Sequence, residues 1–309
     1  MSNLLIHSPY ADHTGQGNSV TAVRLGKILS GGGYRVTYSE REYSGEEAEV
    51  MIALNARKSA NAIVRFCELN PSSKLIIILT GTDINHPDSS DEDSAAWASM
   101  MLAERLVVLH EASLKQVPKI FREKTCVIHP SVTLPEGLLH APSKDGFKIM
   151  MAGNMRQEKN PELAHAAAEK ISPALEIHHY GECTSTGSEN VIEHGIFSHD
   201  TMLDAMSSAG VLLNTSFQEG GANAICEAVT MGLPVVASAI SGNIGMLGED
   251  YAGLFPSNDL DALVNMLEKT ANGLEFYALL KKQLATRAPL FTYAQESESW
   301  QDLLNGLSN

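Results

Sequence analysis

Short apolar runs alternate with amphipathic segments along the whole chain. Apolar runs bounded by Gly, Pro, Asn or Asp are typical of buried strands, and apolar residues spaced three and four positions apart indicate helices. Strands that alternate with helices predict βαβ units and a parallel sheet. In the first part of the chain we predict strands at residues 4–7, 35–38, 50–54, 74–79, 106–109 and 125–128, and helices at 20–29 and 56–69.

The same alternation starts again after a stretch rich in Pro, Gly and Ser. This stretch, residues 130–146, is interpreted as a linker. Beyond it we predict strands at 147–151, 175–180, 211–214 and 234–237, and helices at 161–171, 200–208, 222–230 and 260–271. The expected fold class is α/β, with two facing Rossmann-like doubly wound domains at residues 1–140 and 146–290, a cleft between them, and a C-terminal helix at 291–309 that packs across both.

Composition agrees with two globular domains. The chain has 309 residues, of which 44% are hydrophobic and 19% charged, which suits two buried cores and argues against disordered or fibrous proteins. The formal net charge of -15 argues against a general nucleic-acid binder, because such binding needs clustered Lys and Arg. The N-terminal residues lack a basic segment followed by a long apolar run, and no stretch reaches the roughly 20 apolar residues of a membrane span. We therefore expect a cytoplasmic protein without stable membrane insertion.

Cysteine, acidic and histidine patterns do not indicate a metal site. The cysteines are scattered without a Cys-x-x-Cys pair, which is typical of reduced thiols. Asp91, Glu92 and Asp93 fit an Asp-x-Asp metal pattern, but they lie in a polar loop before a helix, where acidic residues favour the helix dipole. His178 and His179 are neighbours on a strand and face opposite sides. We expect no protein-bound metal and no cofactor. The cysteines are Cys67, Cys126, Cys183 and Cys226.

Polar residues that directly follow strands are the main candidates for binding, since ligands of doubly wound domains bind at the carboxyl ends of the strands. One such loop begins at Gly153 and Asn154, contains Arg156 and Lys159, and ends where Pro161 opens a helix. The guanidinium fork of Arg and the ammonium of Lys both bind phosphates, so the loop suits a diphosphate. The alternative is a solvated loop with two ordinary surface cations.

A second, Gly-rich loop joins a predicted strand to a predicted helix. Gly220 and Gly221 allow close approach of the backbone, and the helix presents amides at its N-terminus that suit a phosphate or a sugar hydroxyl. Glu219 and Glu227 are separated by seven residues, so both carboxylates can face the cleft as hydroxyl acceptors. The alternative is a capping carboxylate and an exposed helix Glu. The candidates in this segment are Glu219, Gly220, Gly221, Ala222, Asn223 and Glu227.

Two loops of the first domain are candidates for binding an acceptor. Gly15, Gly17 and Asn18 follow the first strand and precede a helix that we expect to start near Ser19, so their amides suit a compact, phosphate-like anion. The alternative is a common turn.

The other loop follows a later strand and offers hydroxyls and one carboxylate, which can orient an acceptor or take a proton. Its candidates are Thr80, Gly81, Thr82 and Asp83. Here the alternative is that the threonines cap the next segment. Further candidates that carry a cation or an imidazole are Arg24, Arg57, Lys58 and His110. Their ordinary alternatives are surface cations and a histidine at the edge of the core.

The segment from Glu219 to Glu227, followed by Gly-Leu-Pro-Val-Val after the helix, resembles the E-x7-E motif of family 4 glycosyltransferases, which have the GT-B fold. The resemblance implies that Glu227 binds the nucleotide ribose, that Glu219 binds the donor sugar, and that Arg156 and Lys159 bind the diphosphate of a UDP-sugar. Asn154 stands where many members have Arg, and Arg156 is expected to substitute for it. Residues 146–290 then bind the donor, and residues 1–140 bind the acceptor.

Four further segments resemble the selenosugar synthases of selenoneine biosynthesis. They are GNSVTAVR at 17–24, LTGTD at 79–83, RLVVL at 105–109 and SGNIGMLGEDYAGLFP at 241–256. This resemblance implies transfer of a sugar from UDP-N-acetylglucosamine or UDP-glucose to selenophosphate, with formation of a carbon–selenium bond and later loss of the phosphate.

The expected mechanism is direct attack on the anomeric carbon. Arg156, Lys159 and the amides near Gly220 and Gly221 stabilise the departing diphosphate, and an anionic nucleophile needs little help from a general base. Three other functions share this architecture. A glycosyltransferase with a hydroxyl acceptor, either a small molecule or a lipid, differs only in what it glycosylates. A UDP-sugar epimerase would act without an acceptor, and a sensor would bind without turnover.

Overall fold

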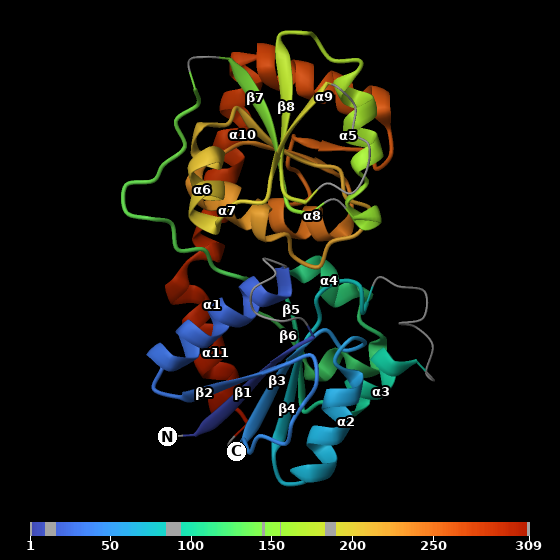
Figure 1. Cartoon of the computed structure of the whole chain (residues 1–309), viewed down its shortest axis with the longest axis vertical. Helices are drawn as coiled ribbons and strands as arrows, with labels where there is room; N and C mark the ends of the chain where they lie inside the picture. The colour runs from blue at the N-terminus through green and yellow to red at the C-terminus, as the bar shows by residue number, and fades with distance from the viewer. Residues whose placement is uncertain are drawn as a thin grey trace. The chain divides into compact units, whose positions relative to one another are not determined.

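The chain folds into two units, each an α/β domain with one sheet (Figure 1). The computed structural model describes residues 2–9, 17–84, 94–143, 146–154, 156–182 and 190–307. The first unit is formed by Met1–Ser131 and Tyr293–Asn309, and the second by Val132–Thr292. The predicted α/β class, with a parallel six-stranded sheet in each of two units, is therefore confirmed. Within the described ranges, no helix combines the length and the apolar content needed to cross a bilayer.

The sheet of the first unit contains the strands β1 (Asn3–Ser8), β2 (Arg35–Glu40), β3 (Val50–Leu54), β4 (Lys74–Ile78), β5 (Arg105–Val108) and β6 (Thr125–Val127). Their order in the sheet is β2-β1-β3-β4-β5-β6, and neighbouring strands pair in parallel. Each of these strands overlaps one predicted from the apolar runs. The carboxyl ends of β1 and β4 therefore lie at the same edge of the sheet.

Helices cover both faces of this sheet. They are α1 (Gly17–Gly31), α2 (Ala60–Leu69), α3 (Ala95–Leu102), α4 (Glu111–Gln116), the 3-10 helix η2 (Lys119–Lys124) and α11 (Tyr293–Asn305). Leu4 and Ile6 of β1 pack in the core that includes Leu25 of α1 and Trp300 of α11. Leu5 lies in the opposite core, under α2 and α3. Alternation of side chains along a buried strand requires this division.

The second unit has the strands β7 (Phe147–Ala152), β8 (Leu175–Tyr180), β9 (Val191–Gly195), β10 (Val211–Asn214), β11 (Val235–Ser238) and β12 (Leu254–Phe255). Their order is β12-β11-β10-β7-β8-β9, again with parallel pairs. The helices are η3 (Gln157–Lys159), α5 (Pro161–Ala168), α6 (His199–Ser208), α7 (Asn223–Met231), α8 (Ser241–Leu247), α9 (Leu260–Asn272), α10 (Leu274–Arg287) and η4 (Ala288–Phe291). One core lies under α5 and α9, and the other under α6, α7, α8 and α10. β10 and β7 are neighbours, so the loops that follow them are also neighbours.

Two strands and two helices of the second unit were not predicted from the sequence, for physical reasons. β9 is an edge strand in which only Val191 is fully buried, and β12 has two residues. α8 has seven residues, two of them glycine, and α10 buries only Leu280 and Leu284 of its fourteen. Their patterns of apolar residues are therefore too short or too weak to indicate a strand or a helix.

The C-terminal helix belongs to the first unit. Trp300 and Leu304 of α11 are buried with the residues of α1 and β1. The buried Glu296 carboxylate pairs with Arg24 Nε at 3.1 Å and accepts a hydrogen bond of 2.6 Å from the Ser131 amide. The units divide at Ser131 and at Tyr293. Packing of this helix across both domains, and a first domain that ends at residue 140, remain predictions.

Replacing Glu296 by Ala removes the carboxylate that joins α11 to α1 and to the end of the first unit. Loss of a buried ion-pair partner typically costs several kcal/mol, so we expect the free energy of unfolding to fall by about 3 kcal/mol. Urea titration followed by tryptophan fluorescence measures this change. Glu298→Ala, an exposed position on the same helix, is the control and is expected to change stability by less than about 0.5 kcal/mol. Equal unfolding midpoints for the two variants would contradict this role of Glu296.

Candidate functional site

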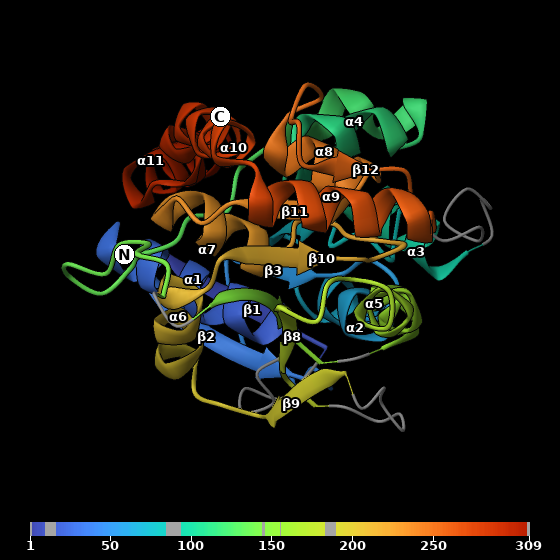
Figure 2. The same cartoon turned by 90° about the horizontal axis from the view of Figure 1, so that it is seen from above.

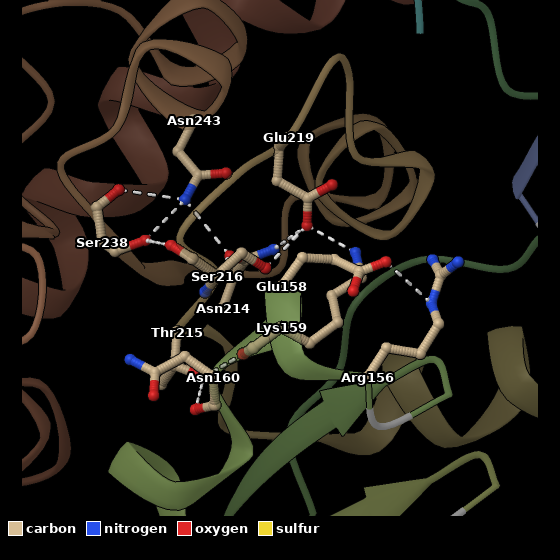
Figure 3. Close-up of polar contacts among 10 residues, drawn as sticks. All are labelled: Arg156, Glu158, Lys159, Asn160, Asn214, Thr215, Ser216, Glu219, Ser238 and Asn243. Carbon is tan, nitrogen blue, oxygen red and sulfur yellow. Dashed lines mark hydrogen bonds and ion pairs between the residues drawn. The ribbon is translucent and has the colours of Figure 1, made fainter. Parts of the chain in front are cut away.

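The Glu219 carboxylate is the centre of a polar network in the second unit. It lies in the loop after β10, and its Oε1 accepts hydrogen bonds from Lys159 Nζ (2.5 Å), Ser216 Oγ (2.7 Å) and Asn214 Nδ2 (3.2 Å). Figure 3 shows these three donors converging on the carboxylate. Lys159 and Glu219 were predicted as separate candidates from two loops, and the structure brings them into contact.

Glu219 is ionised despite its burial. Its side chain is only 10% exposed, and burial by itself raises a carboxyl pKa. The charge of Lys159 and the hydrogen bonds from Lys159, Ser216 and Asn214 outweigh this effect and hold the pKa of Glu219 below its ordinary value of 4.5. The site therefore contains a fixed cation beside a fixed anion at neutral pH.

Backbone contacts join the loop that carries Lys159 to the end of β10. The Thr215 hydroxyl lies 2.8 Å from the Lys159 carbonyl and 3.0 Å from the Asn160 carbonyl. The Phe217 amide donates to the Glu158 carbonyl at 2.8 Å. Asn160 adopts a left-handed φ of 48°, which ends η3 immediately before α5. The loop that carries Lys159 is thus held by the Thr215 hydroxyl and by the main-chain bond between Phe217 and Glu158.

A second layer of amides and hydroxyls supports Asn214. Its Oδ1 accepts from the Ser216 amide at 3.1 Å and from Asn243 Nδ2 of α8 at 3.2 Å. Asn243 also donates to the Ser238 carbonyl at 2.9 Å, and the Ser238 hydroxyl donates to the Ser216 carbonyl at 2.6 Å. A Cβ atom on Gly242 would lie 2.4 Å from the Glu219 carbonyl, so only glycine fits there.

Sequence reasoning missed Asn214, Ser216, Ser238 and Asn243. A local signal existed for two of them, because Asn214 and Ser238 are the last residues of β10 and β11. Polar residues at the carboxyl ends of neighbouring parallel strands are expected to meet. Asn243 gave no comparable signal, since it reaches the site from a helix that the sequence did not reveal.

Arg156 occupies a different place from Lys159. Its side chain is 46% exposed, and its Nε pairs with the Glu158 carboxylate at 3.2 Å. In Figure 3 it lies to one side of the cluster around Glu219. The loop before it starts at Gly153, whose φ of 113° is in the left-handed region that favours glycine. A role of Gly153, Asn154 and Arg156 in holding a diphosphate remains a prediction.

The Gly-rich loop leads into α7 as the sequence predicted. The helix begins at Asn223, Ala222 is its N-cap residue, and Gly232 ends it in a left-handed conformation with φ of 79°. Glu227 lies in the second turn and is buried, which excludes the alternative of an exposed helix Glu. Its Oε1 is 2.8 Å from His199 Nε2 of α6. Gly220 and Gly221 precede the helix, and their role in ligand binding remains a prediction.

In the first unit, Asp83 organises a loop. Its Oδ1 accepts from the amides of Thr80 and Gly81, and its Oδ2 from that of Ala56, each at 2.9 Å. Burial raises the pKa of Asp83 to about 6, and the backbone hydrogen bonds act in the opposite direction. The carboxyl is fully buried and enclosed by backbone amides, and the predicted role in orienting an acceptor or taking a proton remains a prediction.

Asn55 was missed and connects the loops after β3 and β4. Its Nδ2 donates to the hydroxyls of Thr80 (2.8 Å) and Thr82 (2.9 Å). The backbone of Asn55 is left-handed, with φ of 70°. The two threonine hydroxyls are therefore ordered, and their contact with an acceptor, like that of Gly81, remains a prediction.

Other candidates of the first unit take structural positions or lie outside the described residues. Gly17 and Asn18 are already in the first turn of α1, which starts before the expected Ser19. Arg24, expected to attract an anion, pairs with the buried Glu296. His110 is buried and caps α4, with Nδ1 accepting from the Ser113 amide at 3.1 Å. Residues outside the described ranges are Gly15, Asp91, Glu92, Asp93 and Cys183.

Within the part of the chain that the structure describes, no three His, Cys, Asp or Glu side chains are grouped to hold a metal ion. His178 and His179 contact different partners, as expected for neighbours on a strand. His178 Nδ1 lies 2.9 Å from His194 Nε2, whereas His179 Nδ1 lies 2.5 Å from Glu193 Oε2.

Comparison with known proteins agrees with the expected fold and enzyme class. Residues 146–272 match the family model of the Glycosyl transferases group 1. No curated protein sequence matches the chain. The fold is similar to sucrose-phosphate synthase from Thermosynechococcus elongatus, with a TM-score of 0.80, 16% identity, and 99% of each chain covered.

Two further solved structures are similar. HepE of Anabaena, solved with UDP-glucose, has a TM-score of 0.77 and 13% identity, and the match covers 99% of this chain and 100% of HepE. A mutant of TarM from S. aureus, solved with fondaparinux, alpha-GlcNAc-glycerol and UDP, has a TM-score of 0.65 and 18% identity, over 83% of this chain and 55% of TarM. The GT-B fold and the glycosyltransferase class implied by the sequence are confirmed.

The lowered pKa of Glu219 predicts a pH dependence of stability. A carboxyl whose pKa is lowered in the folded state stabilises the protein above its unfolded pKa, and this contribution is lost as the pH falls through the folded pKa. The melting temperature of wild type minus that of Glu219→Gln should be constant above about pH 5.5 and should shrink below about pH 4.5. Thermal unfolding between about pH 3 and pH 7 tests this, with the exposed Glu275→Gln as control. A difference that does not change with pH would show that Glu219 has no lowered pKa.

Proposed function

We propose that this glycosyltransferase, whose second unit matches the group 1 family, takes its sugar from UDP-N-acetylglucosamine or UDP-glucose. The observation that carries the proposal is the contact between Lys159 and the ionised Glu219, at the ends of the neighbouring strands β7 and β10. A fixed ammonium suits the diphosphate, and a fixed carboxylate suits the hydroxyls of the sugar. The solved structures of HepE with UDP-glucose and of TarM with UDP support a nucleotide-sugar donor.

Each candidate then has a distinct task. Lys159 neutralises the diphosphate as the bond between the anomeric carbon and the phosphate oxygen breaks, and the amides around Gly220 and Gly221 share the developing charge. The exposed Arg156 joins Lys159 when the donor binds. Glu219 accepts a hydroxyl of the sugar, and Glu227 accepts the ribose hydroxyls. Fixed charges cost no reorganisation during the reaction, which is why a preformed pair suits this role.

We further propose that the acceptor is selenophosphate. The support is the resemblance of four segments to selenosugar synthases, together with the enclosure of Asp83 by amides, since an anionic nucleophile does not require a general base. A selenium lone pair forms the bond to the anomeric carbon while UDP leaves with the electrons of the broken carbon–oxygen bond. Water then cleaves the phosphorus–selenium bond, which releases phosphate and leaves a selenol sugar.

Removing Lys159 or Glu227 is expected to weaken UDP binding. A hydrogen bond to a charged group contributes about 1.5–3 kcal/mol, so Lys159→Ala and Glu227→Ala should each raise the Kd of UDP about tenfold or more. Isothermal titration calorimetry measures this. Lys170→Ala removes a lysine that pairs with Asp261 on the surface of the same unit, and it should leave the Kd unchanged. Unchanged binding in Lys159→Ala would place the diphosphate elsewhere.

The acceptor is tested by product analysis. Wild-type protein incubated with UDP-N-acetylglucosamine and selenophosphate under reducing conditions should release UDP and a selenium-bearing sugar, both detected by mass spectrometry. Glu227→Ala should yield neither. Binding of the UDP-sugar without a selenium product would overturn the selenophosphate assignment and favour a hydroxyl acceptor. Interconversion of UDP-sugars without any acceptor would instead indicate an epimerase.

A further inference from the structure

We infer that His179 is a positioning residue of the donor site, held as an imidazolium between the Glu193 carboxylate and the Gly153 carbonyl. His179 lies on β8, between β7 and the edge strand β9. In Figure 2, β8 and β9 lie at the end of the sheet opposite β12. The inference rests on the proposed function, because its effect is on the loop that carries Arg156 and Lys159.

The contacts of the ring require two protons. The side chain is 1% exposed, with Nε2 at 2.8 Å from the Gly153 carbonyl oxygen and Nδ1 at 2.5 Å from Glu193 Oε2. A carbonyl oxygen only accepts hydrogen bonds, so Nε2 must carry a proton. A carboxylate also only accepts hydrogen bonds, so Nδ1 carries a second proton toward Glu193, whose side chain is 31% exposed. A ring protonated at both nitrogens is a cation.

The charged and titratable groups around His179 are consistent with this state. On β9, Glu193 faces the ring directly and His194 follows it. Burial is the largest cause that lowers the pKa of His194. The charges of His178, of Lys148 on β7 and of His179 lower this pKa further, whereas the charge of Glu193 raises it. His178 contacts Glu176 at 3.1 Å and His194 at 2.9 Å, which are not the partners of His179. The carboxylate of Glu193 is therefore the group that balances the charge of His179.

The Gly153 carbonyl is held from two sides. Besides the bond from His179, Gly181 packs so closely that an added Cβ atom would lie 2.2 Å from the same oxygen. The next residue is also anchored, because Asn154 Oδ1 accepts from the Glu182 amide at 3.0 Å. The beginning of the loop after β7 is thus attached to the end of β8.

The other end of this loop is attached to β10, where Thr215 binds the carbonyls of Lys159 and Asn160. Arg156 and Lys159 lie between the two attachments. Loss of the bond from His179 leaves the Gly153 carbonyl without its buried donor, which is costly and weakens the attachment of this end of the loop. His179 then contributes to positioning both cations through the loop, since the ring itself bonds Glu193 and Gly153.

The protonation state is measured by nitrogen NMR on protein labelled at histidine. Wild-type His179 should show protons on both nitrogens, as its two acceptors require. Its signal is assigned from its absence in His179→Asn. Glu193→Gln should convert the ring to a neutral form, whereas the matched control Glu176→Gln, which alters the partner of His178, should not. A neutral ring in wild type would overturn the inference.

The positioning role is measured by UDP binding. The amide of Gln can replace the Nε2 donor, whereas that of Asn can replace only Nδ1. His179→Asn should therefore raise the Kd of UDP about tenfold, and His179→Gln should restore most of the affinity. Glu193→Gln should weaken binding as well, and Glu176→Gln should not. Equal affinities for the Asn and Gln variants would overturn the role.

Lys159→Ala separates the two proposals. If it weakens UDP binding and neither His179→Asn nor Glu193→Gln does, His179 does not position the loop although the donor site is correct. If Lys159→Ala has no effect, the proposed donor site fails, and the protonation of His179 is still decided by NMR. Should His179→Asn fail to fold, the wild-type NMR measurement and UDP binding by Glu193→Gln still decide the inference.

Discussion

The loops of the second unit depend on keeping one buried carboxylate ionised. Glu219 has little contact with water, and an ionised group in that position requires a cation and hydrogen-bond donors. Lys159 supplies the charge from the loop after β7, while Asn214 and Ser216 supply donors at the end of β10. Segments sixty positions apart in the sequence must therefore meet. The placement of α8 follows, since Asn243 orients Asn214 and only glycine fits at position 242.

The ion pair between Lys159 and Glu219 is ordered because the backbone of the loop around Lys159 is also fixed. Ion pairs between long side chains are weak when the chains are free to move, because ordering them costs entropy. Here the backbone of Lys159 is already fixed through Thr215, and the carboxylate is fixed by two neutral donors. The pair is therefore ordered before any ligand binds, as electrostatic preorganisation in enzymes requires.

The sequence revealed the parallel sheets well and the site in part. Buried parallel strands are continuous apolar runs, so β3, β8 and β10 were predicted with their observed bounds. Lys159 and Glu219 were identified individually because each follows a strand. Their contact, and the participation of Asn243, depend on tertiary structure that local patterns do not contain. The amide contacts of Asp83 could not be predicted either, since a carboxylate that binds backbone amides and one that faces a ligand look the same in a sequence.

The path of the chain makes the second unit an insertion within the first. The chain leaves the first unit after Ser131 and returns at Tyr293, and Val132 and Phe291, close to these two points, are joined by a backbone hydrogen bond of 3.2 Å. Adjacent ends are the condition under which a domain tolerates excision or transplantation. Residues 132–292 therefore form an inserted domain that can be exchanged for the matching segment of a relative, with one junction after Ser131 and the other before Tyr293. Chimeras of this kind would change the domain that matches the glycosyltransferase family while keeping the first unit and its C-terminal helix intact.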